Sequence, residues 1–155
     1  MKATFAAGCF WGVEETFRAI PGVTSTRVGY LGGHTADPSY KEVCTDRTGH
    51  AEAVEVEFDA SKVKYADLLN AFWENHDPTT LNRQGPDQGS QYRSAIFYHS
   101  PEQKQEAEAS REEMGKSGRF RKPIVTQVVD APEFFAAEDY HQQYLAKRGL
   151  SHCHL

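Results

Sequence analysis

Apolar residues in the first part of the chain follow strand-like and helical patterns in turn. Lys2 to Ala7 has the composition of a short strand. A helix is predicted next, because apolar residues recur at helical spacing at Phe10, Val13, Phe17 and Ile20. Pro21 and Gly22 end this pattern. A second strand is predicted over Val23 to Tyr30. This order places Cys9 at a strand-to-helix junction.

The clearest strand pattern covers Ala51 to Asp59. Its apolar and acidic positions alternate: Val54, Val56 and Phe58 with Glu55 and Glu57. The alternation predicts one buried face, and Glu52 falls on it because side chains two residues apart share a face. A strand that begins only at Ala53 would instead leave Glu52 in a solvated loop.

Four further elements are predicted in the second half. They are a helix over Tyr65 to Phe72, a strand over Arg93 to His99, a strand over Ile124 to Val129 and a short helix over Glu138 to Lys147. Between the two strands, Ser100, Pro101 and Gln103 carry the signature of a helix start, and that helix runs to about Met114. Strands and helices interleave without a strict repeat, which predicts an α+β fold with a mixed, mostly antiparallel sheet.

Two long stretches, Leu31 to His50 and His76 to Gln91, show neither pattern. Loops of this length in a compact domain are usually functional. The first contains Tyr40, and the second carries Asp87 with Tyr92 just after it. We therefore expect these loops to contribute to a site.

Composition narrows the class of protein. The 155 residues fit one domain, 1–155, and carry 22 acidic against 17 basic side chains, for a net charge of -5. The only basic cluster, Lys116 to Lys122, gives no field to neutralise phosphates, so nucleic acid is not expected as a partner. The sequence has neither a membrane-length apolar run nor a signal sequence, so we expect a cytoplasmic protein.

Three cysteines without a CxxC pair argue against a secreted disulfide framework and leave either reactive or inert buried thiols. Cys9 lies where the positive end of a helix favours a thiolate, although free cysteines are often simply buried. A core-facing Glu52 would resist ionisation and could serve as a general acid. Phe10 and Trp11 flank the thiol, where aromatic faces can hold a small apolar group.

Six segments resemble the peptide methionine sulfoxide reductase A family across nearly the whole chain. They are GCFWGVE (8–14), GYLGGH (29–34), PSYKEVC (38–44), TGHAEAVEV (48–56), DQGSQYRSAIFY (87–98) and YHQQYL (140–145). The resemblance implies a two-layer α+β sandwich with a ferredoxin-like core and reduction of the S epimer of methionine sulfoxide, free or in proteins. No cofactor and no metal is implied.

The resemblance also implies roles. Cys9 matches the nucleophile, Glu52 the acid, and Tyr40 and Tyr92 the partners of the sulfoxide oxygen. Asp87 matches a polar site residue, and Phe10 and Trp11 match the pocket for the S-methyl group. Attack by Cys9 leaves a sulfenic acid, from which a second thiol recovers the enzyme through a disulfide.

The resolving thiol is expected in the C-terminal tail, 146–155. Cys153 is the candidate because a tail can reach the site, with thioredoxin then regenerating both thiols. Cys44 is expected to be structural. We expect a monomer, and the abrupt end at Leu155 keeps open a domain of a fusion with a B-type reductase.

Two other functions fit parts of the sequence. A Cys-His hydrolase would use Cys9 with His50 or His76 and a carboxylate such as Asp77, but it gives Trp11 no role. A zinc module would use His34, His50, Cys44 and the tail residues His152, Cys153 and His154, whose spacings match no standard zinc pattern.

Overall fold

A six-stranded sheet forms the centre of the computed structural model, which describes residues 1–149. The strands lie in the order β7-β6-β1-β3-β2-β8, and every neighbouring pair is antiparallel except the parallel pair β6 and β7. Their bounds are β1 Lys2–Ala7, β2 Val23–Leu31, β3 Ala51–Phe58, β6 Ser94–Tyr98, β7 Gln127–Asp130 and β8 Phe135–Ala136. The predicted mixed, mostly antiparallel sheet is confirmed.

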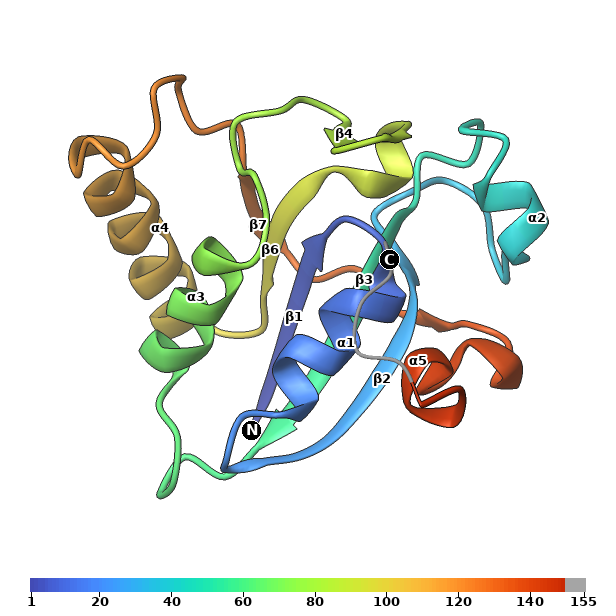
Figure 1. Ribbon diagram of the computed structural model, residues 1–155, viewed down its shortest axis with the longest axis horizontal. Coiled ribbons are helices and arrows are strands. Elements are labelled where there is room, and N and C mark those ends of the chain that lie inside the picture. Colours follow the sequence, from blue (N-terminus) through green and yellow to red (C-terminus); the bar gives the residue numbers. More distant parts are fainter. Residues whose placement is uncertain (150–155) are drawn as a thin grey trace.

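Three helices pack on one face of this sheet (Figure 1). They are α1 (Phe10–Arg18), α3 (Tyr65–Glu74) and α4 (Pro101–Lys116). The chain order β1-α1-β2-β3-α3-β6, with the strands arranged β6-β1-β3-β2, is that of a ferredoxin-like core. The two-layer α+β sandwich is thus confirmed.

The aromatic residues of the predicted patterns hold the layers together. The Phe5 ring of β1 stacks on Phe17 of α1 with centroids 4.8 Å apart. The centroid of Phe72 of α3 lies 5.5 Å from that of Phe5. At the start of α4, the Ser100 hydroxyl accepts the Gln103 N–H at 3.2 Å, as the helix-start signature predicted. The local signals therefore locate α1, α3 and the start of α4 correctly.

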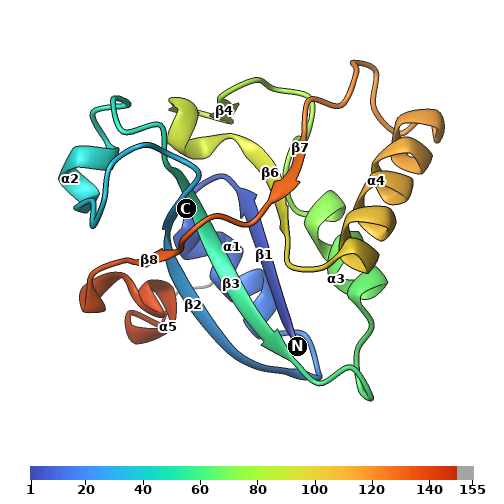
Figure 2. The same ribbon diagram turned by 180° about the vertical axis from the view of Figure 1, so that it is seen from behind.

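The opposite face of the sheet is covered as well, by the stretch 131–136 that crosses it between β7 and β8 (Figure 2). Ala131 and Phe134 of this stretch pack on a second apolar cluster, formed by Ala6, Leu31, Ala51, Ala53, Ala95 and Phe97. The prediction that β3 buries only one face is therefore wrong. Glu55, expected in solvent, is 8% exposed and pairs with Arg27 at 3.0 Å.

Both long loops contain short elements that the sequence did not predict. The first holds α2 (Tyr40–Val43), and the second holds the hairpin of β4 (Arg83–Gln84) and β5 (Asp87–Gln88), followed by the 3-10 turn η1 (Ser90–Tyr92). The strand expected from Ile124 begins only at Gln127. The reason is that the Val125 N–H bonds the Pro78 carbonyl at 2.8 Å instead of a neighbouring strand.

The single helix predicted over Glu138 to Lys147 is instead two pieces, η2 (Asp139–His141) and α5 (Tyr144–Lys147). Gln143 between them has the left-handed φ of 51°, which interrupts a helix. Gln142 turns its carboxamide onto β2, where it bonds both the N–H and the carbonyl of Val28 at 2.9 Å. Across residues 1–149, no helix has the length and apolar character that crossing a bilayer requires.

Candidate active site

Cys9 is the N-cap of α1, and Gly8 separates it from the end of β1. Gly8 has a φ of 103°, and a Cβ there would lie 2.9 Å from Cγ of Gln84, so only glycine fits this turn. The junction places the Cys9 side chain beside the first N–H groups of the helix, which favour a thiolate. The structure thus gives Cys9 the position predicted for it.

Glu52 is buried beside this junction. It is the second residue of β3 and 1% exposed, so the alternative of a strand that begins at Ala53 is wrong. Its Oε1 accepts the backbone N–H of Phe10 at 3.2 Å. A single hydrogen bond therefore joins the carboxyl group to the residue that follows Cys9.

Two phenols lie within electrostatic reach of Glu52. Burial raises the pKa of Tyr40 and of Tyr92 well above the ordinary tyrosine range, and an ionised Glu52 would raise both further. Asp87 and Cys9 raise the pKa of Tyr92 further. Cys9, Glu52, Tyr40, Asp87 and Tyr92, five of the polar residues named from the sequence, are thus linked by electrostatic interactions, and both phenols keep their protons.

Phe10 and Trp11 differ in their surroundings. Phe10 is fully buried, with its ring centroid 5.7 Å from Tyr30 and 6.3 Å from Tyr40. Trp11 is half-buried, 6.3 Å from Tyr40, and stacks on Tyr144 with centroids 3.8 Å apart. Phe10 thus packs in the core beneath the site, and Trp11 is the more accessible of the two aromatic side chains.

His141 is a site residue that the sequence analysis did not single out. It is 1% exposed, and its Nδ1 accepts the indole N–H of Trp11 at 2.9 Å. Its ring centroid lies 4.4 Å from Tyr40 and 5.2 Å from Phe10. Burial lowers the pKa of His141, so the ring is neutral and carries its proton on Nε2. It lies within the family motif YHQQYL (140–145), but its contacts with Trp11 and Tyr40 could not be predicted from that segment alone.

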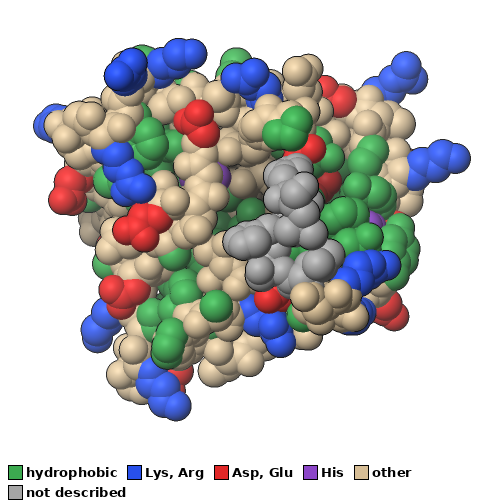
Figure 3. Space-filling model, viewed as in Figure 1, with side chains coloured by type: hydrophobic (Ala, Val, Ile, Leu, Met, Phe, Trp, Pro, Cys, Tyr) green, Lys and Arg blue, Asp and Glu red, His purple; other side chains and the backbone are tan. Residues whose placement is uncertain are grey.

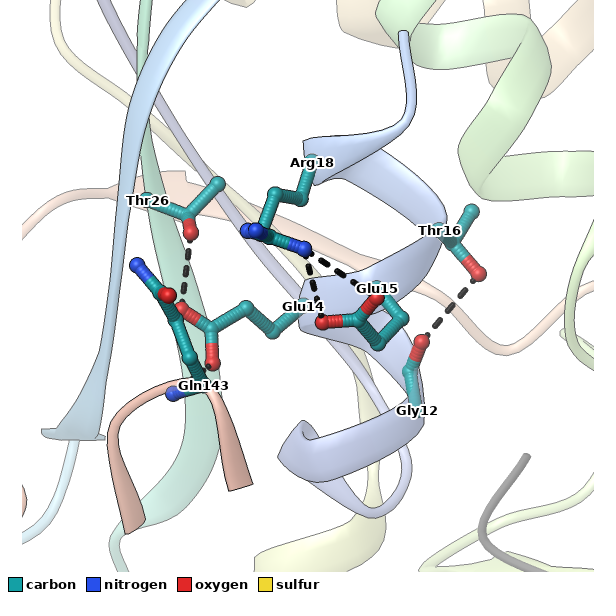
Figure 4. A network of polar contacts seen from close by, with 7 residues as sticks. All are labelled: Gly12, Glu14, Glu15, Thr16, Arg18, Thr26 and Gln143. Carbon is teal, nitrogen blue, oxygen red and sulfur yellow. Dashed lines mark hydrogen bonds and ion pairs between the residues drawn. The ribbon is translucent and has the colours of Figure 1, made fainter. Parts of the chain in front are cut away.

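Glu14 of α1, like Glu52, has a buried carboxyl group (Figure 4). Its two oxygens accept the Thr26 hydroxyl and the Gln143 N–H, each at 2.7 Å. Burial raises its pKa, and these bonds partly oppose the shift. Glu14 thereby ties α1 to β2 and to the C-terminal segment. Helical spacing could have found it, because Phe10, Glu14 and Phe17 share one face.

Cys44 is exposed rather than part of the core, and its thiol is hydrogen bonded with Tyr40. It also contributes to the raised pKa of Tyr92, so it faces the site. Cys44 is therefore not a core residue, and its structural role stays a prediction. Cys153, the predicted resolving thiol, lies outside the described residues.

The hydrolase interpretation needs a histidine that can accept a proton from Cys9. His50 uses Nδ1 to accept the Gly33 N–H at 3.1 Å and Nε2 to contact the Thr35 carbonyl at 2.7 Å. His76 uses its nitrogens on the Phe72 carbonyl and the Ser94 hydroxyl, at 2.6 and 2.7 Å. Both rings are committed to structural bonds, which argues against this interpretation.

The zinc interpretation needs three ligands in one place. Within residues 1–149, no three His, Cys, Asp or Glu side chains are grouped so as to hold a metal ion. The tail histidines of that interpretation lie outside the described part. The described residues therefore provide no metal centre for the chemistry at Cys9.

Known proteins resemble this chain along its length. The family profile "Peptide methionine sulfoxide reductase" matches residues 1–155. The peptide methionine sulfoxide reductase MsrA of Methanoculleus marisnigri is 62% identical over 152 residues, covering 98% of this chain and 93% of the relative. Reduced Mxr1 from Saccharomyces cerevisiae has a TM-score of 0.91 at 35% identity, covering 99% of this chain and 88% of that one.

Mxr1 has also been solved in complex with Trx2. That chain gives a TM-score of 0.65 at 24% identity, with 93% of this chain and 84% of that one covered. At this identity the likeness shows the shared fold alone.

Proposed function

This chain belongs to the peptide methionine sulfoxide reductase family and reduces methionine sulfoxide with a thiol, and we propose that Cys9 is that thiol. The observation that carries the proposal is the bond from the Phe10 N–H to Glu52, which holds an acid next to the nucleophile. Residues 1–155 form one catalytic domain in this proposal, and it acts on the S epimer, free or in peptides.

The first step needs an activated sulfoxide. A sulfoxide sulfur is a poor electrophile until its oxygen is protonated or strongly hydrogen bonded, and buried Glu52 is placed to give that proton. Tyr40 and Tyr92 keep their hydroxyl protons and donate hydrogen bonds to the same oxygen. Asp87 holds the polar end of the substrate, and Trp11, above buried Phe10, receives the S-methyl group.

Attack by the Cys9 thiolate on the sulfoxide sulfur transfers the oxygen to Cys9. Methionine leaves, and Cys9 becomes a sulfenic acid. A second thiol, Cys153 in our proposal, then attacks the Cys9 sulfur, releasing water and forming a disulfide. Thioredoxin reduces this disulfide with its own dithiol and restores both cysteines. Because thioredoxin must itself be kept reduced, the proposed cycle places the enzyme in a reducing compartment such as the cytoplasm.

One experiment tests the assignment of Cys9. The reductant-dependent conversion of each sulfoxide epimer is measured separately for wild type and Cys9→Ser. The serine variant should be inactive, because a hydroxyl near neutral pH is a far weaker nucleophile and forms no sulfenic acid. Substantial activity in that variant, or equal conversion of the two epimers by wild type, would contradict the proposal.

A further inference from the structure

A basic hollow of about 560 Å³ lies between the loop that follows α4 and the loop that precedes β4. Its charged lining consists of four cations and two anions: Arg83, Arg119, Arg121 and Lys122 with Glu74 and Asp77. Figure 3 shows Lys and Arg side chains at the upper edge of this face and scattered over its other edges, with Asp and Glu side chains between them. The hollow is thus positive on a chain whose net charge is -5.

The four cations form no close ion pair among the described residues, although Arg119 lies over the Phe120 ring and Lys122 helps to lower the pKa of Asp77. The ion pairs recorded within residues 1–149 involve Arg18, Arg27 and Lys116, and none of the cations of the hollow. The Asp77 carboxylate is already engaged, since it accepts the Thr79 N–H and hydroxyl at 2.9 and 2.5 Å. His76 adds no positive charge, because burial lowers its pKa to about 4.

Gln84 connects a residue that lines the hollow to the residue before Cys9. The Gln84 Oε1 accepts the backbone N–H of Asp77, which lines the hollow, at 2.9 Å. The same side chain packs against Gly8, the residue before Cys9. The β4-β5 hairpin then continues from Arg83 in the hollow to Asp87 in the site. A chain bound across this hairpin therefore reaches both places.

We propose that the basic hollow binds acidic side chains that flank an oxidised methionine in a protein substrate. The inference rests on the reaction proposed at Cys9. Extended peptide advances about 3.3 Å per residue, so carboxylates within about six residues of the methionine sulfoxide come within about 20 Å of it. Long-range attraction between these carboxylates and the four cations lowers KM for acidic substrates and leaves the chemical step unchanged.

The test uses peptides with one methionine sulfoxide and paired Glu residues two, four or six positions to either side, each matched by a Gln peptide. In wild type at low salt, at least one Glu peptide should have a KM about fivefold below that of its Gln partner, as expected for one or two exposed ion pairs. The kcat values should agree. The double variant Arg119→Glu, Lys122→Glu should abolish or reverse the difference.

A matched control carries Lys62→Glu and Lys104→Glu, which change the net charge equally at exposed positions outside the hollow. It should keep the preference, and both variants should turn over free methionine sulfoxide as wild type does. No preference in wild type, or the same loss in the control, would overturn the inference. So would a preference of unchanged size in the Arg119, Lys122 variant. If either variant lost turnover with free methionine sulfoxide, the substitutions would have disturbed the reaction at Cys9 and not the binding of acidic side chains.

Discussion

The indole of Trp11 donates its N–H to Nδ1 of His141 across 2.9 Å, between residues 130 positions apart in the chain. This bond fixes the plane of the indole and holds His141 in the tautomer with its proton on Nε2. Because the same imidazole packs on Tyr40, one buried ring sets the positions of two groups at the site.

A double-mutant cycle should measure this relationship. His141→Phe removes the acceptor and leaves a partly buried indole N–H without a partner, which should lower the free energy of unfolding by about 1–3 kcal/mol. In a Trp11→Phe background, which has no indole N–H, His141→Phe should lower the free energy of unfolding by less. Urea denaturation should give a coupling energy of about 1 kcal/mol. Strictly additive effects would show that the bond does not stabilise the fold.

Glu52→Gln should fold normally and slow the reductive step by about 10²-fold or more, the usual scale for the loss of a general acid. The Gln amide can replace the carboxyl group in size but cannot release a proton. Single-turnover conversion of methionine sulfoxide is the appropriate measurement, and Glu57→Gln, at the surface end of the same strand, is the matched control. A rate within about threefold of wild type would remove Glu52 from this role.

Cys153→Ser should separate the two chemical steps. The variant should still convert about one equivalent of substrate without reductant and accumulate a sulfenic acid that dimedone labels, while thioredoxin-driven cycling largely fails. Wild type should end with a disulfide between Cys9 and Cys153.

Cys44→Ser is the informative control for that experiment, because the structure places Cys44 beside the site. Its serine hydroxyl can keep a bond with Tyr40, so recycling should match wild type. Unimpaired thioredoxin turnover in Cys153→Ser, with a disulfide between Cys9 and Cys44, would identify Cys44 as the resolving thiol instead.

His76 should make stability depend on pH. Its pKa falls from an ordinary value near 6.5 to about 4 in the fold, so only the unfolded chain takes up this proton between those values. The free energy of unfolding should therefore fall as the pH drops from about 6.5 to about 4, with His76 contributing at most about 1.4 kcal/mol per pH unit. Urea denaturation of His76→Gln should show a shallower dependence, and equal slopes would contradict the assignment.

Local patterns in the sequence predicted the parts of the fold that local physics determines. Alternation in β3 located the strand but left Glu52 either on its core face or in a loop, and the Ser100 signature located the start of α4. The family motifs pointed to Tyr40 and Tyr92, whose common neighbourhood the structure then showed. These features depend on residues close together in the chain or on a distinctive set of motifs.

The features that the sequence did not predict depend on distant contacts. The alternation in β3 predicts a solvated Glu55, but in the structure the stretch 131–136 covers that face of the sheet. The break at Gln143 follows from its backbone bond to Glu14, 129 positions away, which outweighs the helical preference of its neighbours. His141 acquires its role only when Trp11 lies opposite. No pattern within one segment contains that information.

The carboxamide of Gln142 has a consequence for how copies of this protein behave toward one another. The short strand β8 pairs with only two residues of β2, Gly29 and Tyr30, so the next backbone groups along β2 would lie at an open sheet edge. Such edges recruit strands from other chains and start aggregation. Gln142 bonds both the N–H and the carbonyl of Val28, and the Ala137 N–H bonds the same carbonyl, so strand addition is blocked at that residue.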